Sequence, residues 1–239
     1  MTEPSFENRT VFVTGATRGI GAAIAAGFRA AGAKVIGTGT HGAPPGSFDE
    51  YFQADFSDIA QIRACAEYVL HLKPDVLINN AGINKNLPFV EIDPIVFQRI
   101  QQVNVFAPFS LCQAAIPAMK RRGWGRIVNI CSIWGKIGKE HRASYSASKF
   151  ALDGLTLSLA AEHAVDGILA NCVAPGFTDT ELTQKMLGED GIRKILSAVP
   201  IRRMASVEEI ATFVVWLGSP ENSYITGQNI AIDGGFSRV

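Results

Sequence analysis

Short apolar runs alternate with longer helical stretches along the whole sequence. Strands that are apolar throughout are typical of a parallel sheet with helices on both faces. The predicted strands are residues 10–14, 34–38, 75–79, 126–130, 169–174 and 229–232. The predicted helices are residues 20–31, 59–72, 94–121, 143–163 and 207–217. The alternation predicts an α/β fold, with a doubly wound, mostly parallel sheet of about seven strands and right-handed crossovers. No linker or repeat interrupts it, so we expect a single domain over residues 1–239.

The connection after the second strand is too short for an ordinary crossover. Residues 41–46 contain two prolines and two glycines, which leave little room for a helix. Parallel crossovers normally need about a dozen residues or more. We therefore expect a loop here, followed by a weak third strand near residues 51–53.

Composition excludes several function classes. Twenty-two basic residues balance twenty-two acidic ones at a sequence pI of about 6.9, which argues against nucleic-acid binding. The N-terminal residues lack signal-peptide features, and no apolar run is long enough to span a membrane. Cys65, Cys112, Cys131 and Cys172 are far apart in the sequence and are expected to be buried free thiols. The four histidines are too scattered for a metal site. A cytoplasmic protein is expected.

The first strand leads into a glycine-rich turn with Gly15, Gly19 and Gly21 in the pattern G-x-x-x-G-x-G. Glycines here let the backbone approach a pyrophosphate, which then meets amide groups at a helix N-terminus. Glycines also occur in ordinary tight turns. The position between a leading strand and an alanine-rich helix favours a dinucleotide-binding Rossmann fold.

The end of the second strand indicates which dinucleotide binds. NAD-binding domains place an acidic residue there, whereas this sequence has Thr38-Gly39-Thr40-His41. Arg18 in the glycine turn can serve as a ligand for a 2′-phosphate. This pattern favours NADP(H), while NAD(H) stays possible. The alternative is that Arg18 is a solvated loop residue and Thr38 merely ends the strand.

The residues most indicative of chemistry are Ser132, Tyr145 and Lys149. Tyr145 and Lys149 are four apart in a predicted helix and share one face. An ammonium beside a phenol favours the phenolate, so such a tyrosine can act as a general acid or base. Ser132 follows the fifth predicted strand and can donate a hydrogen bond to a carbonyl oxygen. An isolated Tyr-x-x-x-Lys pair is usually an exposed pair on a helix with no catalytic role. Here the pair follows a glycine turn, an Asn-Asn-Ala-Gly at residues 79–82 and a serine at a strand end, and this combination disfavours a chance pair.

Together these motifs resemble the short-chain dehydrogenase/reductase family over essentially the whole chain. Residues 14–21 match its TGxxxGxG motif, and residues 79–82 match its NNAG motif. Ser132 with Tyr145 and Lys149 matches its Ser…YxxxK motif, and Asn104 its fourth catalytic residue. Residues 175–178 and 225–235 match two further motifs near the C-terminal end.

The resemblance implies a role for each matching position. Tyr145 is expected to protonate the substrate oxygen, Ser132 to hold that oxygen, and Asn104 to support a proton relay toward Lys149. The residues expected to bind the cofactor are Gly15, Thr17, Arg18, Gly19, Ile20, Gly21, Thr38, Asp55, Phe56, Asn80, Ala81, Gly82, Tyr145, Lys149, Pro175, Gly176 and Thr178. Asp55 and Phe56 would hold the adenine, and the backbone near Thr178 the carboxamide. No metal is expected.

Within the family, the sequence looks most like 3-oxoacyl-(acyl-carrier-protein) reductases. The resemblance implies an NADP(H)-dependent reductase of 3-oxoacyl thioesters that forms a homotetramer, with a dimer as the alternative. Gly123 and Asp166 stand where such enzymes present basic residues to an acidic carrier protein. A sugar, polyol or cyclic-diol dehydrogenase therefore stays open, as does a non-catalytic NADP-binding sensor or scaffold.

Substrate specificity is expected in residues 83–89, 133–142 and 178–199. The second segment contains Trp134 and four basic or imidazole side chains, which indicate an anionic or hydroxylated substrate or simply a solvated rim. Within it, His141 is either a relay or a surface-loop residue. The third segment, with Gly188 and Gly191, has the composition of a mobile lid.

Overall fold

Seven parallel strands form one sheet in the order β3-β2-β1-β4-β5-β6-β7, in a computed structural model that describes residues 5–42 and 46–239 without the side chains at positions 182, 185–187, 189 and 190. The strands are β1 Thr10–Val13, β2 Lys34–Gly39, β3 Glu50–Gln53, β4 Val76–Asn79, β5 Gly125–Ile130, β6 Ile168–Pro175 and β7 Asn229–Ile232. The strand order reverses direction at β1 and β4, as in a doubly wound sheet. The predicted fold class is confirmed. The single domain over residues 1–239 stays a prediction.

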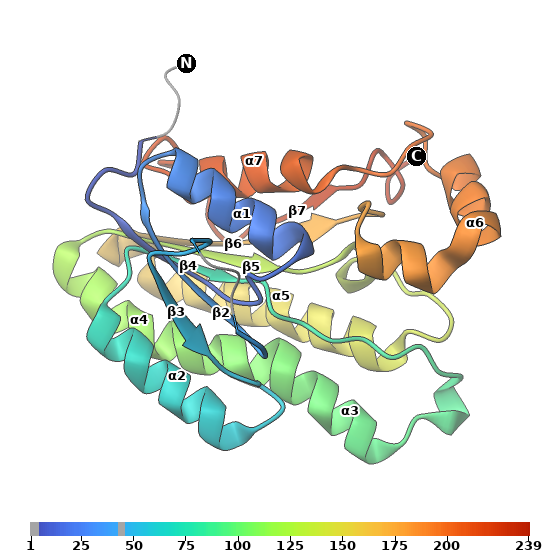
Figure 1. The fold of residues 1–239 in the computed structure, drawn as a ribbon, viewed down its shortest axis with the longest axis horizontal. Coiled ribbons are helices and arrows are strands. Elements are labelled where there is room, and N and C mark those ends of the chain that lie inside the picture. The colour runs from blue at the N-terminus through green and yellow to red at the C-terminus, as the bar shows by residue number, and fades with distance from the viewer. Residues whose placement is uncertain (1–4, 43–45) are drawn as a thin grey trace.

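Helices cover both faces of the sheet (Figure 1). The helices are α1 Gly19–Ala30, α2 Ile59–Leu72, α3 Pro94–Gln101, α4 Ala107–Arg122, α5 Ala143–His163, α6 Glu181–Ala198 and α7 Val207–Leu217. One core lies beneath α1 and α7, and a second lies beneath α2 and α4 on the opposite face. Strands buried on both faces explain why their sequences are apolar throughout.

The connection between β2 and β3 has no helix in the part that the structure describes, as predicted. Phe48 packs against the backbone of Gly37, where an added Cβ atom would lie 2.6 Å from the ring. The Tyr51 hydroxyl donates to the backbone carbonyl of His41. The short strand β3 therefore holds the end of β2 in place.

The helix predicted over residues 94–121 is not continuous. A π-helical turn, η2 Gln102–Phe106, lies between α3 and α4. Pro108 begins the next turn and has no N–H to donate to the carbonyl of Asn104, so the regular α-helical bond cannot form there. The sequence pattern did not predict the π-helical turn, because one extra residue in a helix changes the spacing of the hydrophobic residues too little to be recognised.

The predicted helices do not include residues 178–199, where the structure has helix α6. Helix α6 begins after Thr180, whose side-chain hydroxyl accepts a hydrogen bond from the backbone of Thr183 at 3.1 Å. Gly188 has a non-helical φ of 61° and ψ of 177°, so α6 consists of two helical segments that meet at a kink. Whether this segment moves as a lid stays a prediction.

No helix among the described residues is long and apolar enough to cross a membrane. In the same part of the chain, no group of three or more His, Cys, Asp or Glu side chains is placed to hold a metal ion. All four cysteines are free and buried, as predicted. Burial raises the pKa of the Cys65 and Cys112 thiols to about 12.

Candidate active site

The glycine-rich turn lies at the carboxyl end of β1 and is closely packed. Gly15 and Gly19 have φ values of 60° and 54°, which favour glycine. A Cβ atom on Gly21 would lie 2.2 Å from the carbonyl oxygen of Gly15, so no other residue fits without movement. The turn leads into α1, whose N-cap residue Arg18 makes no side-chain capping bond, so a ligand can bind the first helical amides.

Side chains join this turn to the Asn-Asn-Ala-Gly segment at the end of β4. The Thr14 hydroxyl accepts hydrogen bonds from the backbone N–H groups of Asn80 and Ala81, both at 2.9 Å. The Asn80 amide donates to the carbonyls of Thr14 and Gly15, both at 3.0 Å. The strand ends are adjacent because β1 pairs with β4. Two separately predicted motifs are thus parts of one site.

At the end of β2, the side chains fit a 2′-phosphate. Arg18 is the exposed N-cap residue of α1 and makes no ion pair within the described residues. The Thr38 hydroxyl is buried without a hydrogen-bond partner. No carboxylate stands in the sequence from Thr38 to His41. The Gln53 side chain donates to the carbonyl of Thr40 at 3.1 Å, which holds this strand end.

The predicted adenine-binding residues follow β3. Asp55 lies in a turn where its carboxylate accepts a hydrogen bond from the N–H of Ser57 at 2.8 Å. The Phe56 side chain is buried, and its carbonyl accepts from the Gln102 amide at 3.0 Å. The adenine role of both residues stays a prediction.

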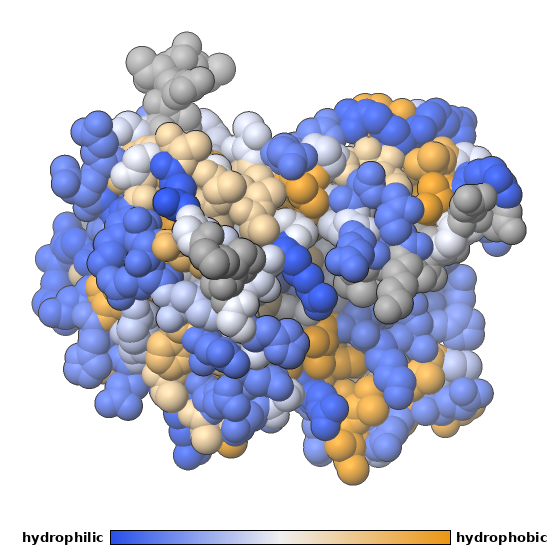
Figure 2. Space-filling view, in the orientation of Figure 1, coloured by the Kyte–Doolittle hydropathy of each residue, from blue (hydrophilic) through white to orange (hydrophobic). Residues whose placement is uncertain are grey.

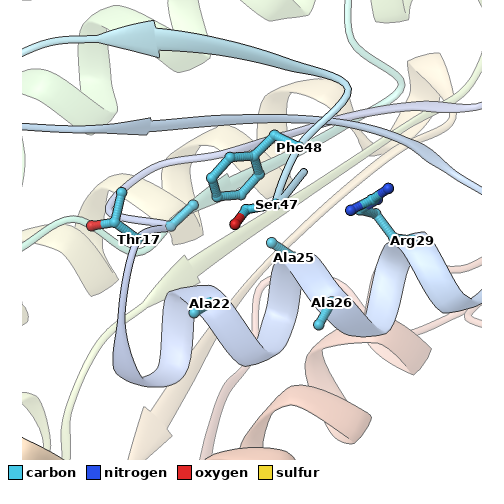
Figure 3. A pocket seen from close by; sticks show the side chains of 8 residues that line it. Thr17, Ala22, Ala25, Ala26, Arg29, Ser47 and Phe48 are labelled. Atoms are coloured by element: carbon cyan, nitrogen blue, oxygen red, sulfur yellow. The ribbon is translucent and has the colours of Figure 1, made fainter. Parts of the chain in front are cut away.

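A cavity of about 310 Å³ lies beside the glycine turn, between α1 and the segment that precedes β3 (Figure 3). Thr17 lines one end and Arg29 the other, with Phe48 between them. Three alanines of α1 contribute much of the remaining wall, and Arg29 donates to the carbonyl of Gly46 at 2.5 Å. None of the predicted catalytic side chains lines this cavity, so it is not the reaction site.

Lys149 is the central charged group of the site. Its side chain is buried, and its ammonium donates to the carbonyl of Ile130, at the end of β5, at 2.7 Å. The same ammonium lies 5.5 Å from the ring centroid of Tyr145. An ammonium carries three donors, and this is the one hydrogen bond that the described residues offer it. The remaining donors suit the hydroxyls of a ribose.

Ser132 lies two residues beyond Ile130, on a segment packed against α5. An added Cβ atom on Gly135 would lie 2.8 Å from the Lys149 Cβ atom, so this glycine permits the close approach. The Ser132 hydroxyl accepts from the N–H of Trp134 at 3.2 Å and can still donate its own proton. Ser132, Tyr145 and Lys149 thus converge on the end of β5.

Asn104 reaches this site from the π-helical turn. Its amide nitrogen donates to the Ser148 hydroxyl at 3.0 Å, and that hydroxyl donates to the carbonyl of Tyr145 at 2.6 Å. Asn104 is completely buried and also bonds both backbone groups of Ile83. Sequence reasoning missed Ser148, because a serine beside a motif residue carries no signal of its own.

The segment after β6 closes the site on its other side. A Cβ atom on Gly176 would lie 2.7 Å from the Cα of Asp233, after β7. Thr178 is buried and forms an isolated β-bridge with Ala205. Thr180 lies near Gly19 of the glycine turn, so the start of α6 adjoins the expected phosphate site.

The four histidines of the chain do not form a cluster at this site. His141 is exposed and adopts a φ of 64°, consistent with the surface-loop interpretation.

Cys131 lies next to Ser132 in the sequence and contacts a second buried cysteine. Its sulfur lies 3.3 Å from the sulfur of Cys172 and 3.5 Å from the carbonyl oxygen of Lys149. The hydrogen bond from this pair lowers the pKa of Cys131 and raises that of Cys172.

A glycine turn on the first strand of a doubly wound sheet, with a buried lysine beside a tyrosine, defines a dinucleotide-dependent oxidoreductase. The family model described as enoyl-(acyl carrier protein) reductase matches residues 15–237. The chain belongs to the short-chain dehydrogenase/reductase family, and the predicted resemblance is confirmed.

Several known proteins are similar over nearly their full length. The 3-oxoacyl-(acyl-carrier-protein) reductase FabG of Salmonella typhimurium is 38% identical, covering 98% of this chain and 100% of that protein. The acetoacetyl-CoA reductase of Shinella zoogloeoides is 35% identical over 95% of this chain and 98% of its own. A crystal structure from Beutenbergia cavernae with bound NADP, assigned as an NAD(P)-dependent gluconate 5-dehydrogenase, superimposes with a TM-score of 0.92 at 35% identity, covering 97% of this chain and 98% of that one.

Proposed function

We propose that this oxidoreductase interconverts a ketone and a secondary alcohol with NADP(H). The observation that carries the proposal is the buried Lys149 ammonium, fixed by the Ile130 carbonyl and lying beside the Tyr145 ring. A cation kept beside a phenol supports proton transfer by that phenol. The segment that bears Ser132 packs against the same lysine.

Features of the structure itself fit a bound NADP(H). The compact glycine turn, the unpartnered Thr38 hydroxyl and the spare donors of Lys149 each suit one part of a dinucleotide phosphate. When bound, the nicotinamide ring supplies or accepts the hydride. The residues proposed to hold the cofactor are Gly15, Thr17, Arg18, Gly19, Ile20, Gly21, Thr38, Asp55, Phe56, Asn80, Ala81, Gly82, Tyr145, Lys149, Pro175, Gly176 and Thr178.

The chain's own residues then act on the substrate oxygen. In the reductive direction, Tyr145 donates its hydroxyl proton to that oxygen, and in the oxidative direction it takes the proton back. Ser132 donates a hydrogen bond to the same oxygen and holds it in place. Lys149 orients the cofactor ribose and stabilises the tyrosinate. Asn104 positions this group through Ser148.

NADP(H) is favoured over NAD(H) by the charges at the end of β2. The exposed Arg18 and the buried, unpartnered hydroxyl of Thr38 suit a phosphate. Residues 38–41 include no acidic side chain that would repel it. The gluconate dehydrogenase structure with bound NADP supports the same choice.

Two substrate classes follow from the similar proteins. The first is a 3-oxoacyl thioester, supported by the two reductases among the relatives. Two features argue against docking of an acidic acyl carrier protein: Lys120 is paired with Asp166 at 3.0 Å, and Gly123 offers no charge. The second is a sugar acid, supported by the gluconate dehydrogenase structure.

A homotetramer is also proposed, with helices of two subunits paired. Apolar residues gather over α3 on the face shown in Figure 2. An open groove of about 470 Å³ runs beside them, lined by Phe97, Val105, Phe106 and Phe109 among others. Such an exposed apolar surface is typical of an interface. Four free cysteines fit a reducing compartment, which supports a cytoplasmic location.

The test is NADPH oxidation with a short 3-oxoacyl thioester and with 5-keto-D-gluconate, comparing the wild type with Tyr145→Phe. We expect the variant to lose about 10²- to 10⁴-fold in turnover, because it lacks the acidic proton. NADPH binding, followed by fluorescence, is expected to persist. Unchanged turnover in Tyr145→Phe would contradict the mechanism. NADPH binding without turnover of any carbonyl substrate would favour a sensor or scaffold.

A further inference from the structure

Arg142 is a partly buried guanidinium with no acidic partner among the described residues. Its side chain makes no hydrogen bond or ion pair with the described residues, and its Cζ atom lies 5.6 Å from the centre of the Trp134 ring. Burial lowers the pKa of Arg142, and the nearby Tyr145 opposes that effect. An arginine stays charged in proteins, so its desolvation without an anion is unfavourable.

The backbone fixes Arg142 beside the reaction site. His141 has a φ of 64°, an uncommon conformation for a residue with a side chain. Its carbonyl accepts a hydrogen bond from the N–H of Leu87 at 3.1 Å, which joins two of the segments expected to bind substrate. Helix α5 begins at the next residue after Arg142 and carries Tyr145 in its first turn. Arg142 therefore precedes Tyr145 by three residues, about 4.5 Å along a helix axis.

An aromatic wall of Trp134, Phe177 and Phe236 continues this surface. The Trp134 ring lies 6.1 Å from Phe177 and 6.0 Å from Phe236, with edge contacts in both pairs. Phe177 and Phe236 are 5.2 Å apart. The backbone N–H of Trp134 donates to the Ser132 hydroxyl, so the wall begins at a proposed catalytic residue. Contacts with Phe177 and Phe236 hold the Trp134 ring near which Arg142 lies.

We propose that Arg142 binds a carboxylate of the substrate, a few bonds from the carbon that exchanges the hydride. This inference rests on the proposed function, because it takes the reacting oxygen to be held by Ser132 and Tyr145. A guanidinium binds a carboxylate with two parallel hydrogen bonds, and the Arg142 guanidinium lies near the Trp134 ring, with Cζ 5.6 Å from the ring centre. The phosphate on the carrier arm of a thioester substrate is many bonds from the ketone, so it would lie too far from the reacting carbon to bind Arg142. The site accordingly recognises short oxo acids better than uncharged ketones.

Lys139 lacks these properties although it lies near the same ring. Its ammonium is 5.8 Å from the centre of the Trp134 ring, but it is paired with the carboxylate of Glu140 at 3.0 Å. Both side chains of that pair are largely exposed. Of the two cations beside the Trp134 ring, Arg142 is therefore the one without a carboxylate partner among the described residues.

The test compares 4-oxopentanoate with its methyl ester, which share a carbon skeleton and differ in charge. For the wild type, we expect kcat/KM to be higher for the acid by about 10- to 100-fold, the value of a charged hydrogen-bonded pair. Arg142→Gln should remove this preference by raising KM for the acid while leaving the ester unchanged. Arg142→Lys should restore part of it, because a point charge replaces the planar fork. Arg121→Gln, an exposed arginine of α4, is the control and should retain the preference.

Further measurements separate this inference from the proposed function. Thermal unfolding and NADPH binding of Arg142→Gln should match the wild type, since the Arg142 side chain makes no hydrogen bond with the described residues and its backbone bond to Ser146 is kept. Calorimetric titration of 4-oxopentanoate into the protein with NADP should show binding that Arg142→Gln abolishes. Turnover of a 3-oxoacyl thioester without any preference for the acid would overturn the inference alone. Failure of every carbonyl substrate would overturn the proposed function, and the titration would then decide whether Arg142 binds the carboxylate.

Discussion

Asn104 and Ile83 exchange two hydrogen bonds, although they lie on different elements. The side-chain oxygen of Asn104 accepts from the Ile83 N–H, and its amide nitrogen donates to the Ile83 carbonyl, both at 2.9 Å. This amide also donates to Ser148 at 3.0 Å. One side chain therefore connects the segment after β4 to the helix that carries Tyr145 and Lys149.

Substitution of Asn104 should affect both activity and stability. In Asn104→Ala, the two backbone groups of Ile83 lose their partners, and we expect the free energy of unfolding to fall by about 1–3 kcal/mol. Turnover should fall more than NADPH affinity, because the proposed role is to position the helix of Tyr145. Denaturant titration and steady-state kinetics measure both effects. Gln101→Ala, which removes a bond to the Ser144 carbonyl instead, is the control and should change turnover little.

Arg18 should determine the cofactor preference. In Arg18→Ala, we expect NADPH affinity to fall by about 10-fold, as for a lost hydrogen bond to a charged group, with NADH affinity unchanged. The wild-type preference should also weaken as the salt concentration rises. Arg121→Ala, in α4, serves as the matched control. Equal use of NADH and NADPH by the wild type and by Arg18→Ala would refute the 2′-phosphate assignment.

Gly21 should be irreplaceable for cofactor binding. The Cβ atom of Gly21→Ala would lie 2.2 Å from the Gly15 carbonyl oxygen, so the turn must open. NADPH binding, measured by fluorescence titration, should weaken by at least about 10-fold, the loss of one charged hydrogen bond. Gly138→Ala, whose Cβ would meet nothing within 4 Å, should bind as the wild type does. Normal binding by Gly21→Ala would show that this turn does not receive the phosphates.

Glu209 should make the start of α7 sensitive to acid. Its hydrogen bonds with Arg203 and with the backbone of Ser206 lower the pKa of Glu209 from 4.5 to about 2. A carboxyl pKa that is lower in the folded state stabilises the fold above pH 4.5, and this contribution is lost as the pH falls toward 2. Thermal unfolding between these pH values should show a smaller pH dependence for Glu209→Gln. An identical dependence in both proteins would exclude this role.

Much of the fold could be predicted because its signals are local. The apolar runs of β4 and β5 are buried on both faces and therefore read as continuous hydrophobic segments. The limits of α2, α5 and α7 coincide with the predicted ones. Thr180 and Gly188 show the limit of this reasoning. Gly188 interrupts α6 with non-helical backbone angles, yet a second helical segment follows the kink, and no local signal predicts that segment.

The site was predictable in its residue types and less so in its connections. The order of the motifs indicated Lys149, but its bond to the Ile130 carbonyl depends on how β5 packs against α5. Arg142 was visible only as one of several cations in a loop. The structure is needed to show that Arg142 has no acidic partner among the described residues, whereas the nearby Lys139 is paired with Glu140. The catalytic roles stay predictions until variants are measured.

The π-helical turn Gln102–Phe106 makes the position of Asn104 depend on chain length as well as on residue identity. Each residue of an α-helix turns the chain by about 100°. Deleting one residue there would restore a regular α-helix, but the helix before it would rotate by that angle relative to α4. The amide would then leave Ile83 and Ser148 even with every side chain preserved. Within this helix, an insertion or deletion would therefore be more disruptive than most substitutions, and homologous helices can be compared at the active site only when their π turns are aligned.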